Sequence, residues 1–279
     1  AVTFQLTDED VPLQDAATVM LVRDGNEGLE VFMLRRNLDS DFVGGAYVFP
    51  GGAVDHEDGQ SDVEDLCQGR SDHDASAFLG LDSGGLAFWV AAIRESFEEA
   101  GVLLAYDRDG DVIHLDDPTT AERFRTHREE VDQSRRRLLD VCRDERLVLA
   151  VDQMYYFSNW ITPEGAPRRY DTRFFVAAAP NGQTPLEDGV ETIAHLWITP
   201  AEALARNRAG EFELIFPTIR SLEAIGRFDS AAELLDAAAH ITNVPAILPR
   251  IISEEGGFRI VLPGDGEFDA LTGQPVGDR

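Results

Sequence analysis

Lysine is absent from this chain of 279 residues, so its 24 basic side chains are all arginines, and they stand against 52 acidic residues. The formal net charge at pH 7 is -28. A surface with this charge repels phosphate backbones and anionic headgroups, so we expect neither a nucleic-acid partner nor a membrane partner. A small anionic ligand stays compatible with the composition where arginines or metal ions gather locally. A GC-rich genome and a salt-adapted proteome explain the composition equally well.

Cysteine is scarce, because only Cys67 and Cys142 are present. Two cysteines exclude a disulfide scaffold and a four-cysteine zinc site, and a cytoplasmic location is the simplest expectation. Long apolar runs are also missing: residues 86–93 fall well short of the roughly 20 that a membrane span needs. The first residues lack a basic segment ahead of an apolar core, so we expect no signal peptide.

The coarse pattern of the chain alternates strands and helices irregularly. Residues 16–22 and 29–34 favour strands around a Gly-containing turn, which predicts a hairpin. Further candidate strands are 47–49, 147–151, 158–161, 173–179 and 194–198. Candidate helices are 86–105, 122–146, a segment opening at Thr199 and Pro200, 216–225 and 231–240. Such mixing indicates an α+β fold with a mixed sheet.

The segment 55–85 is rich in Asp, Gly and Ser. This composition predicts an acidic insertion or a flexible loop more than a core element.

The candidate helix 86–105 carries the pattern with the most chemistry. Its apolar side chains gather on one side at about 100° per residue, and we expect this side to face the core: Leu86, Trp89, Val90, Ile93 and Phe97. Glu95, Glu98 and Glu99 cluster on the opposite face. Three neighbouring carboxylates repel one another unless a hard divalent cation binds them. An acidic helix face is more commonly a solvated face, so the neighbouring residues decide between these readings.

Those neighbours form a motif. The run from Arg94 to Val102, with Phe49, Pro50, Gly51 and Gly52 upstream, resembles the signature of the Nudix hydrolases. That signature reads G-x5-E-x7-R-E-U-x-E-E-x-G-U, where U is aliphatic. The chain matches every invariant letter of the second half, at Arg94, Glu95, Glu98, Glu99 and Gly101. Ser96 replaces the first aliphatic residue of this half.

The first half of the motif departs from the family pattern. Counting from Gly52 leads to Asp58 in place of Glu, whereas counting from Gly51 leads to Glu57, so two registers are open. The spacer before Arg94 is several times longer than the family's seven residues, which places an insertion at about 59–86. Such an interrupted motif resembles a subgroup that includes coenzyme A and acyl-CoA diphosphatases. The later matches to it are 160–163, 171–175 and 216–218, so the resemblance spans roughly 16–226.

The resemblance implies a single Nudix domain over residues 1–279, an α/β/α sandwich with a mixed sheet and added C-terminal helices at about 200–262. It implies Mg²⁺ or Mn²⁺ as the cofactor, with Glu95, Glu98 and Glu99 as metal ligands. Glu98, Glu95 and Arg94 would be catalytic, and the backbone of Gly51 and Gly52 would complete the site.

Other site residues are also expectations from the resemblance. Arg35 and Arg36 end a strand whose edge would face the substrate, although surface ion pairs explain them equally well. Glu191, in preference to Glu187, would be a further base or metal ligand. The basic cluster at 135–137 has the charge to bind a ribose phosphate of coenzyme A, but a solvated helix face is the stronger expectation.

The expected function is metal-dependent hydrolysis of the diphosphate in a nucleoside diphosphate linked to another moiety, with coenzyme A or acyl-CoA among the candidates. The partners are therefore a small-molecule diphosphate and, as an open alternative to a monomer, a second copy of the chain in a homodimer. A non-catalytic Nudix-like sensor that binds a nucleotide is the alternative function. Because both ends of the insertion lie beside the expected metal site, we also expect it to form a rim that influences substrate choice.

Overall fold

The computed structural model describes residues 11–38, 44–187, 189–254 and 257–263. The first residues, considered above for a signal peptide, lie outside this part. The strands are β1 Leu13–Gly25, β2 Gly28–Arg36, β3 Tyr47–Val48, β4 Gly51–Ala53, β5 Ala105–Tyr106, β6 Val148–Leu149, β7 Met154–Ile161, β8 Arg169–Ala178, β9 Thr192–Ile198, β10 Ala246–Ile247, β11 Arg250–Glu254 and β12 Gly257–Val261. The α-helices are α1 Asp72–Leu79, α2 Leu86–Ala100, α3 Pro118–Asp132, α4 Leu138–Glu145, α5 Pro200–Arg208, α6 Phe216–Ile225 and α7 Ala231–Ala239.

The central sheet is mixed and has eight strands. Its main path runs β10-β7-β8-β1-β2-β3, and β4 and β9 pair with β1 and β2. The pairs β1·β8 and β7·β10 are parallel, and the other pairs are antiparallel. β1 pairs with β4 over Ala16–Thr18 and with β2 from Val22 onwards. The first half of β1 therefore holds Gly51 and Gly52, in β4, in the sheet.

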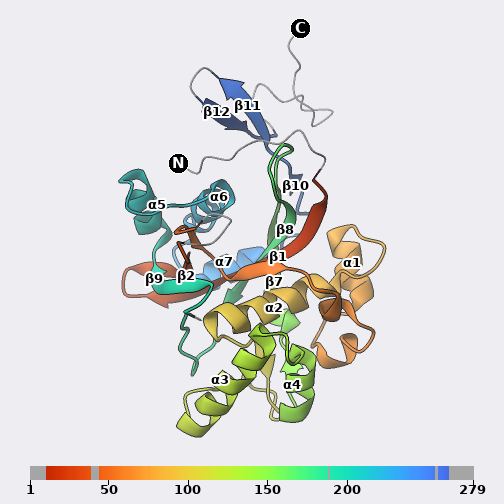
Figure 1. Cartoon of the computed structure of the whole chain (residues 1–279). Helices are drawn as coiled ribbons and strands as arrows, with labels where there is room; N and C mark the ends of the chain where they lie inside the picture. The colour runs from red at the N-terminus through yellow and green to blue at the C-terminus, as the bar shows by residue number, and fades with distance from the viewer. Residues whose placement is uncertain (1–10, 39–43, 188, 255–256, 264–279) are drawn as a thin grey trace.

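Helices cover both faces of this sheet, which confirms the expected α/β/α sandwich. Side chains of β1 alternate between two buried clusters, with Val19 and Leu21 in one and Met20 and Val22 in the other. The first cluster includes α2 and parts of α3 and α4, and the second includes α5, α6 and α7 (Figure 1). None of the helices in the described part of the chain has the length and apolar character to cross a membrane.

Two sequence-based expectations for helices were wrong. The segment 122–146 is two helices, α3 and α4, because the chain reverses direction at Ser134, whose φ is 53°. No Gly or Pro marks this break in the sequence. The helix expected to reach residue 105 ends at Ala100, since Gly101 takes a left-handed conformation with a φ of 66°. The region from about 200 to 262 contains α5 to α7 but continues as short strands after residue 239.

The segment 55–85 is folded, so the expectation of a flexible loop was also wrong. It contains α1 and two short 3₁₀ helices, and it contributes the buried Val63 and Ala75 to the core beside α2. The Asp72 carboxylate accepts hydrogen bonds from the N–H groups of Gly84 and Leu86, both at 3.0 Å, and Ser76 accepts one from Gly85. These acceptors satisfy backbone donors at the start of α2, where the helix dipole also favours negative charge.

We therefore expect Asp72→Ala to lower the free energy of unfolding by about 1–2 kcal/mol, because it removes a cap from a buried helix end. Urea unfolding followed by circular dichroism measures the change. Asp82→Ala is the matched control, because Asp82 lies exposed in the same connection and makes neither of these contacts. Equal stability of the two variants would show that Asp72 does not anchor α2.

Candidate active site

The Arg94 guanidinium is the centre of the candidate site. Arg94 is 8% exposed, and its Nε and Nη2 donate to Asp58 at 3.0 Å each. Its Nη1 donates to Glu95 at 2.8 Å and to Glu98 at 2.9 Å, and Nη2 also donates to the Ala53 carbonyl at 2.8 Å. One buried cation therefore joins both halves of the interrupted motif.

The structure distinguishes between the two registers of the first half. Asp58 is 3% exposed and bonds to Arg94, whereas Glu57 is exposed to solvent. Asp58 also accepts a hydrogen bond from the Asp55 N–H at 2.8 Å, within a short 3₁₀ helix over His56–Gly59. The register counted from Gly52 is therefore the one that pairs a carboxylate with Arg94 of the motif. In this register Asp58 stands where the family signature has Glu.

Gly51 and Gly52, at the start of β4, pack directly against β1 and α2. A Cβ at Gly51 would lie 2.6 Å from the Ala17 carbonyl oxygen, and a Cβ at Gly52 would lie 2.5 Å from Glu95 Oε1. At Gly51 the close atoms include the backbone of β1, so only glycine permits this approach there. As a result the Gly51 N–H donates to Glu99 Oε2 at 2.9 Å, which fixes the third glutamate.

The three glutamates carry more negative charge than their surroundings compensate. Burial raises the pKa of Glu95 to about 7 and the pKa of Glu98 to about 8, although Arg94 opposes both shifts. Burial and the charge of Glu95 also raise the pKa of Glu99 well above its ordinary value. Glu99 is 4% exposed, so this part of α2 is not the solvated face that the sequence pattern suggested.

The donor set suits a hard divalent cation. Carboxylate and backbone oxygens are the ligands that Mg²⁺ and Mn²⁺ prefer, and an added cation would offset the charge that raises these pKa values. Within the described ranges, no three His, Cys, Asp or Glu side chains already surround one point. The reason lies in the pairing: Arg94 bridges Glu95 and Glu98, while Glu99 turns to Gly51.

The other expected site residues lie at the ends of β2 and β9. Arg36 is close enough for its charge to lower the pKa of Glu99, and the charge of Glu191 raises the pKa values of Glu95 and Glu99. The Glu191 carbonyl accepts from the Asn37 N–H at 2.8 Å, so the ends of these strands are joined. The Glu187 carboxylate instead lies within hydrogen-bond distance of His195 Nδ1. Arg35 donates to the Gly45 carbonyl at 3.3 Å.

The connection between α3 and α4 lies beside the candidate site, although its charged sequence indicated a solvated helix face. A pocket of about 260 Å³ beside Glu98 and Arg94 is lined by this connection and by residues 55–58. Arg136 and Arg137 line it, whereas Arg135 is exposed and does not. The sequence of three consecutive arginines does not indicate which of them line the pocket, because their orientation depends on the turn at Ser134.

A model described as the NUDT19 Nudix domain matches residues 81–225, which include α2 and its glutamates. The acyl-coenzyme A diphosphatase NUDT19 of Xenopus laevis is 30% identical over 280 residues, covering 88% of this chain and 73% of the relative. The human protein of the same name is 28% identical, covering 86% of this chain and 72% of its own length.

A solved structure has a similar fold. The crystal structure of a Nudix hydrolase from Alicyclobacillus acidocaldarius superposes with a TM-score of 0.66 at 26% sequence identity. The match covers 84% of this chain and 99% of the other. The shared fold therefore extends over most of the sandwich and is not confined to the motif.

The contacts of Arg94 lead to a prediction about stability. We expect Arg94→Gln to lower the free energy of unfolding in EDTA by about 3 kcal/mol or more, because buried carboxylates lose their cation. Mg²⁺ should restore part of the loss, since it supplies positive charge at the same place.

Urea unfolding with and without MgCl₂ measures both effects. Arg143→Gln is the control: Arg143 pairs with Asp140 at 2.9 Å on the exposed side of α4, where an ion pair contributes less than about 1 kcal/mol. If Arg94→Gln changed stability no more than this control, the central role of Arg94 would be refuted.

Proposed function

Because this chain belongs to the Nudix family represented by the NUDT19 Nudix domain, we propose that it hydrolyses the diphosphate of coenzyme A or acyl-CoA with the help of Mg²⁺ or Mn²⁺. The chain is a Nudix diphosphate hydrolase of the α+β class. The names of the relatives in Xenopus and human support coenzyme A derivatives as the substrate class.

One observation in the structure carries the proposal: three largely buried glutamates lie on one turn of α2, where Arg94 pairs with Glu95 and Glu98 and the Gly51 N–H holds Glu99. In this arrangement Glu95, Glu98 and Glu99 would hold the divalent cations that Nudix hydrolases generally use. When bound, such cations neutralise phosphate charge and lower the pKa of a coordinated water. A binding-only sensor has no need of this surplus of buried negative charge, which favours the enzyme over the alternative of a nucleotide sensor.

The residues of the chain have separate tasks in this proposal. Arg94 holds Glu95 and Glu98 on the same side of α2 through bonds of 2.8 and 2.9 Å. Glu98, which is 14% exposed at its side chain, is the proposed acceptor of a proton from the attacking water. Glu191, which is exposed at the start of β9, is the second candidate for this role.

Arg36 and the backbone of Gly51 and Gly52 would bind the substrate. Arg36 Nε is buried, and it has no hydrogen-bond acceptor among the described residues. A phosphate oxygen of the substrate would satisfy this unpaired N–H donor with a charge-assisted hydrogen bond. The backbone of Gly51 and Gly52 lies beside Glu95 and Glu99 and would line the same site. Arg35, one residue earlier on β2, is proposed to assist Arg36.

Hydrolysis would add one water across the P–O–P linkage of the substrate. One phosphorus gains the hydroxyl, and the other phosphate leaves with the bridging oxygen and takes up the proton. Coenzyme A would give adenosine 3′,5′-bisphosphate and 4′-phosphopantetheine. The 3′-phosphate on the ribose and the thiol or thioester at the far end stay intact.

We expect Glu98→Gln to lower kcat about 100-fold or more, because the change keeps side-chain volume but removes a charged ligand of the proposed metal site and the proposed proton acceptor. Steady-state kinetics with the best substrate measures the loss. Glu202→Gln on α5 makes the same chemical change at an exposed ion pair with Arg206 and should retain wild-type kcat. Activity of folded Glu98→Gln within threefold of wild type would refute the assignment of Glu98.

The substrate and cofactor are tested together with a panel of diphosphates. Purified protein is assayed with coenzyme A, acetyl-CoA, NADH and ADP-ribose in Mg²⁺, Mn²⁺ or EDTA, and products are identified by mass. We expect coenzyme A or its thioester to be cleaved fastest, and EDTA to abolish turnover, since a diphosphate and the carboxylates repel each other without cations. Full turnover in EDTA would refute the metal assignment, and preference for ADP-ribose or NADH would refute the coenzyme A assignment.

A further inference from the structure

The pocket beside Glu98 is lined by residues of both charges. The acidic residues are Glu98 and those within 55–58, and the basic residues are Arg94, Arg136 and Arg137. The pocket has a volume of about 260 Å³ and shares Arg94 and Glu98 with the candidate active site. If the diphosphate of a substrate lies at the glutamates, another part of the same substrate can therefore extend into this pocket toward Arg136 and Arg137.

The turn between α3 and α4 determines which arginines face this pocket. Ser134 takes a left-handed conformation, and the N–H groups of Arg135 and Arg136 both donate to the Glu130 carbonyl, at 2.8 and 3.1 Å. After this tight reversal Arg136 and Arg137 line the pocket, while Arg135 is exposed. A left-handed serine is unfavourable for the backbone, so this turn is maintained by its surroundings.

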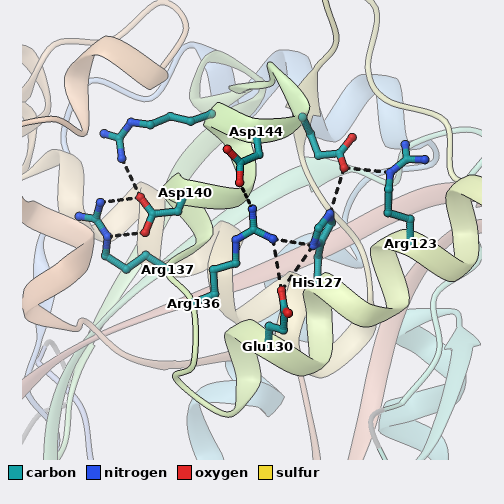
Figure 2. Close-up of polar contacts among 9 residues, drawn as sticks. Arg123, His127, Glu130, Arg136, Arg137, Asp140 and Asp144 are labelled. Atoms are coloured by element: carbon teal, nitrogen blue, oxygen red, sulfur yellow. Dashed lines mark hydrogen bonds and ion pairs between the residues drawn. The ribbon is translucent and has the colours of Figure 1, made fainter.

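Arg136 is held from outside the pocket. Figure 2 shows its guanidinium among His127, Glu130 and Asp144. Its Nη1 lies 2.9 Å from His127 Nδ1 and 3.2 Å from Glu130 Oε2. The Asp144 side chain is 73% exposed, so this ion pair is strongly solvated and is worth little on its own. These partners orient Arg136, and the solvated pair with Asp144 costs little to exchange for a bond to a ligand.

Arg137 is held in a similar way. It forms a bidentate pair with Asp140 at 3.0 and 2.6 Å (Figure 2), and its Nη1 donates to Gln60 at 2.5 Å. Gln60 comes from the insertion, so the insertion helps to position an arginine of the pocket wall. A guanidinium has five N–H donors, and three are used in these bonds, which leaves donors for a further acceptor.

We propose that Arg136 and Arg137 bind a second phosphate of the substrate, a phosphomonoester separated from the scissile diphosphate, such as the one on the ribose of coenzyme A. Arginine forks match phosphate oxygens in geometry and charge, and they are the local positive charge that an anionic substrate needs on a protein of net charge -28. This inference rests on the proposed function, and it makes the two arginines determinants of substrate specificity.

The test compares coenzyme A with 3′-dephospho-coenzyme A, which lacks only that phosphate. We expect Arg136→Gln and Arg137→Gln each to raise KM for coenzyme A about tenfold, because each removes charge-assisted bonds to the phosphate. KM for the dephosphorylated substrate and kcat for both substrates should stay within about twofold of wild type. A purely structural role would instead affect both substrates alike.

Two control variants separate direct binding from loss of charge or of the ion-pair network. Arg135→Gln removes the same charge from the same turn but from outside the pocket. Asp144→Asn removes a partner of Arg136 and keeps the guanidinium. Both should retain the wild-type ratio of the two KM values. If Arg137→Gln fails to fold, Arg137→Lys replaces it, and a several-fold rise in KM confined to coenzyme A is expected, because lysine lacks the planar fork.

A binding measurement distinguishes failure of this inference from failure of the proposed function. Calorimetry with adenosine 3′,5′-bisphosphate and with AMP needs no turnover, and we expect wild type to prefer the bisphosphate about tenfold and the Arg136 and Arg137 variants to lose that preference. Cleavage of both coenzyme A forms with unchanged ratios in the variants would overturn the inference and leave the function intact. If neither form of coenzyme A is cleaved, the proposed function is refuted. If wild type does not prefer the bisphosphate in calorimetry, the phosphate site is refuted, whatever the result of the cleavage assay.

Discussion

The Arg94 guanidinium is buried between carboxylates from two parts of the chain, and the candidate site depends on this contact. Asp58 approaches from the turn after β4, while Glu95 and Glu98 project from the same helix as Arg94. Burial alone would lower the pKa of Arg94, but the bonds to Asp58 and the charges of Glu95 and Glu98 raise it, so it stays charged. A buried charge of this kind is tolerated only because its hydrogen bonds are nearly all made. The same contact keeps Glu95 and Glu98 together despite their mutual repulsion.

The insertion divides the motif in sequence but supports it in space. Lengthening a surface connection costs little entropy, so a long spacer between Asp58 and Arg94 is compatible with their pairing. Asp72 and Ser76 of the insertion satisfy the backbone at the start of α2, and Arg128 of α3 donates to the Glu98 carbonyl near its end at 2.8 Å. The helix that carries the glutamates is thus fixed at its start by the insertion and near its end by α3, which favours a preorganised site.

Charge is distributed very unevenly over this acidic protein. Most of the acidic residues repel an anionic substrate, whereas a few arginines, including Arg36 and Arg94, are placed close to the glutamates. The arginines on the α3–α4 connection extend this pattern, since they are oriented by exposed acidic partners outside the pocket. This arrangement favours binding of an anionic substrate at the candidate site and disfavours it elsewhere on the surface. It also favours substrates whose phosphate groups match the spacing of the arginines.

The sequence by itself determined the family, the α+β class and the helix that carries Arg94, Glu95, Glu98 and Glu99, because helical spacing is a local property and the motif is specific. It did not determine that Asp58 is the partner of Arg94, that the acidic segment is folded, or that Arg136 and Arg137 share a pocket with Glu98. Each of these depends on contacts between residues far apart in the chain or on a left-handed turn at Ser134 that no glycine announces. Composition suggested a flexible loop and solvated helix faces, but burial against the sheet and α2 outweighed those local preferences. Only the tertiary structure decided which charged side chains pair, because electrostatic pairing depends on distance in space and on burial. Neither quantity follows from the spacing of residues along the sequence.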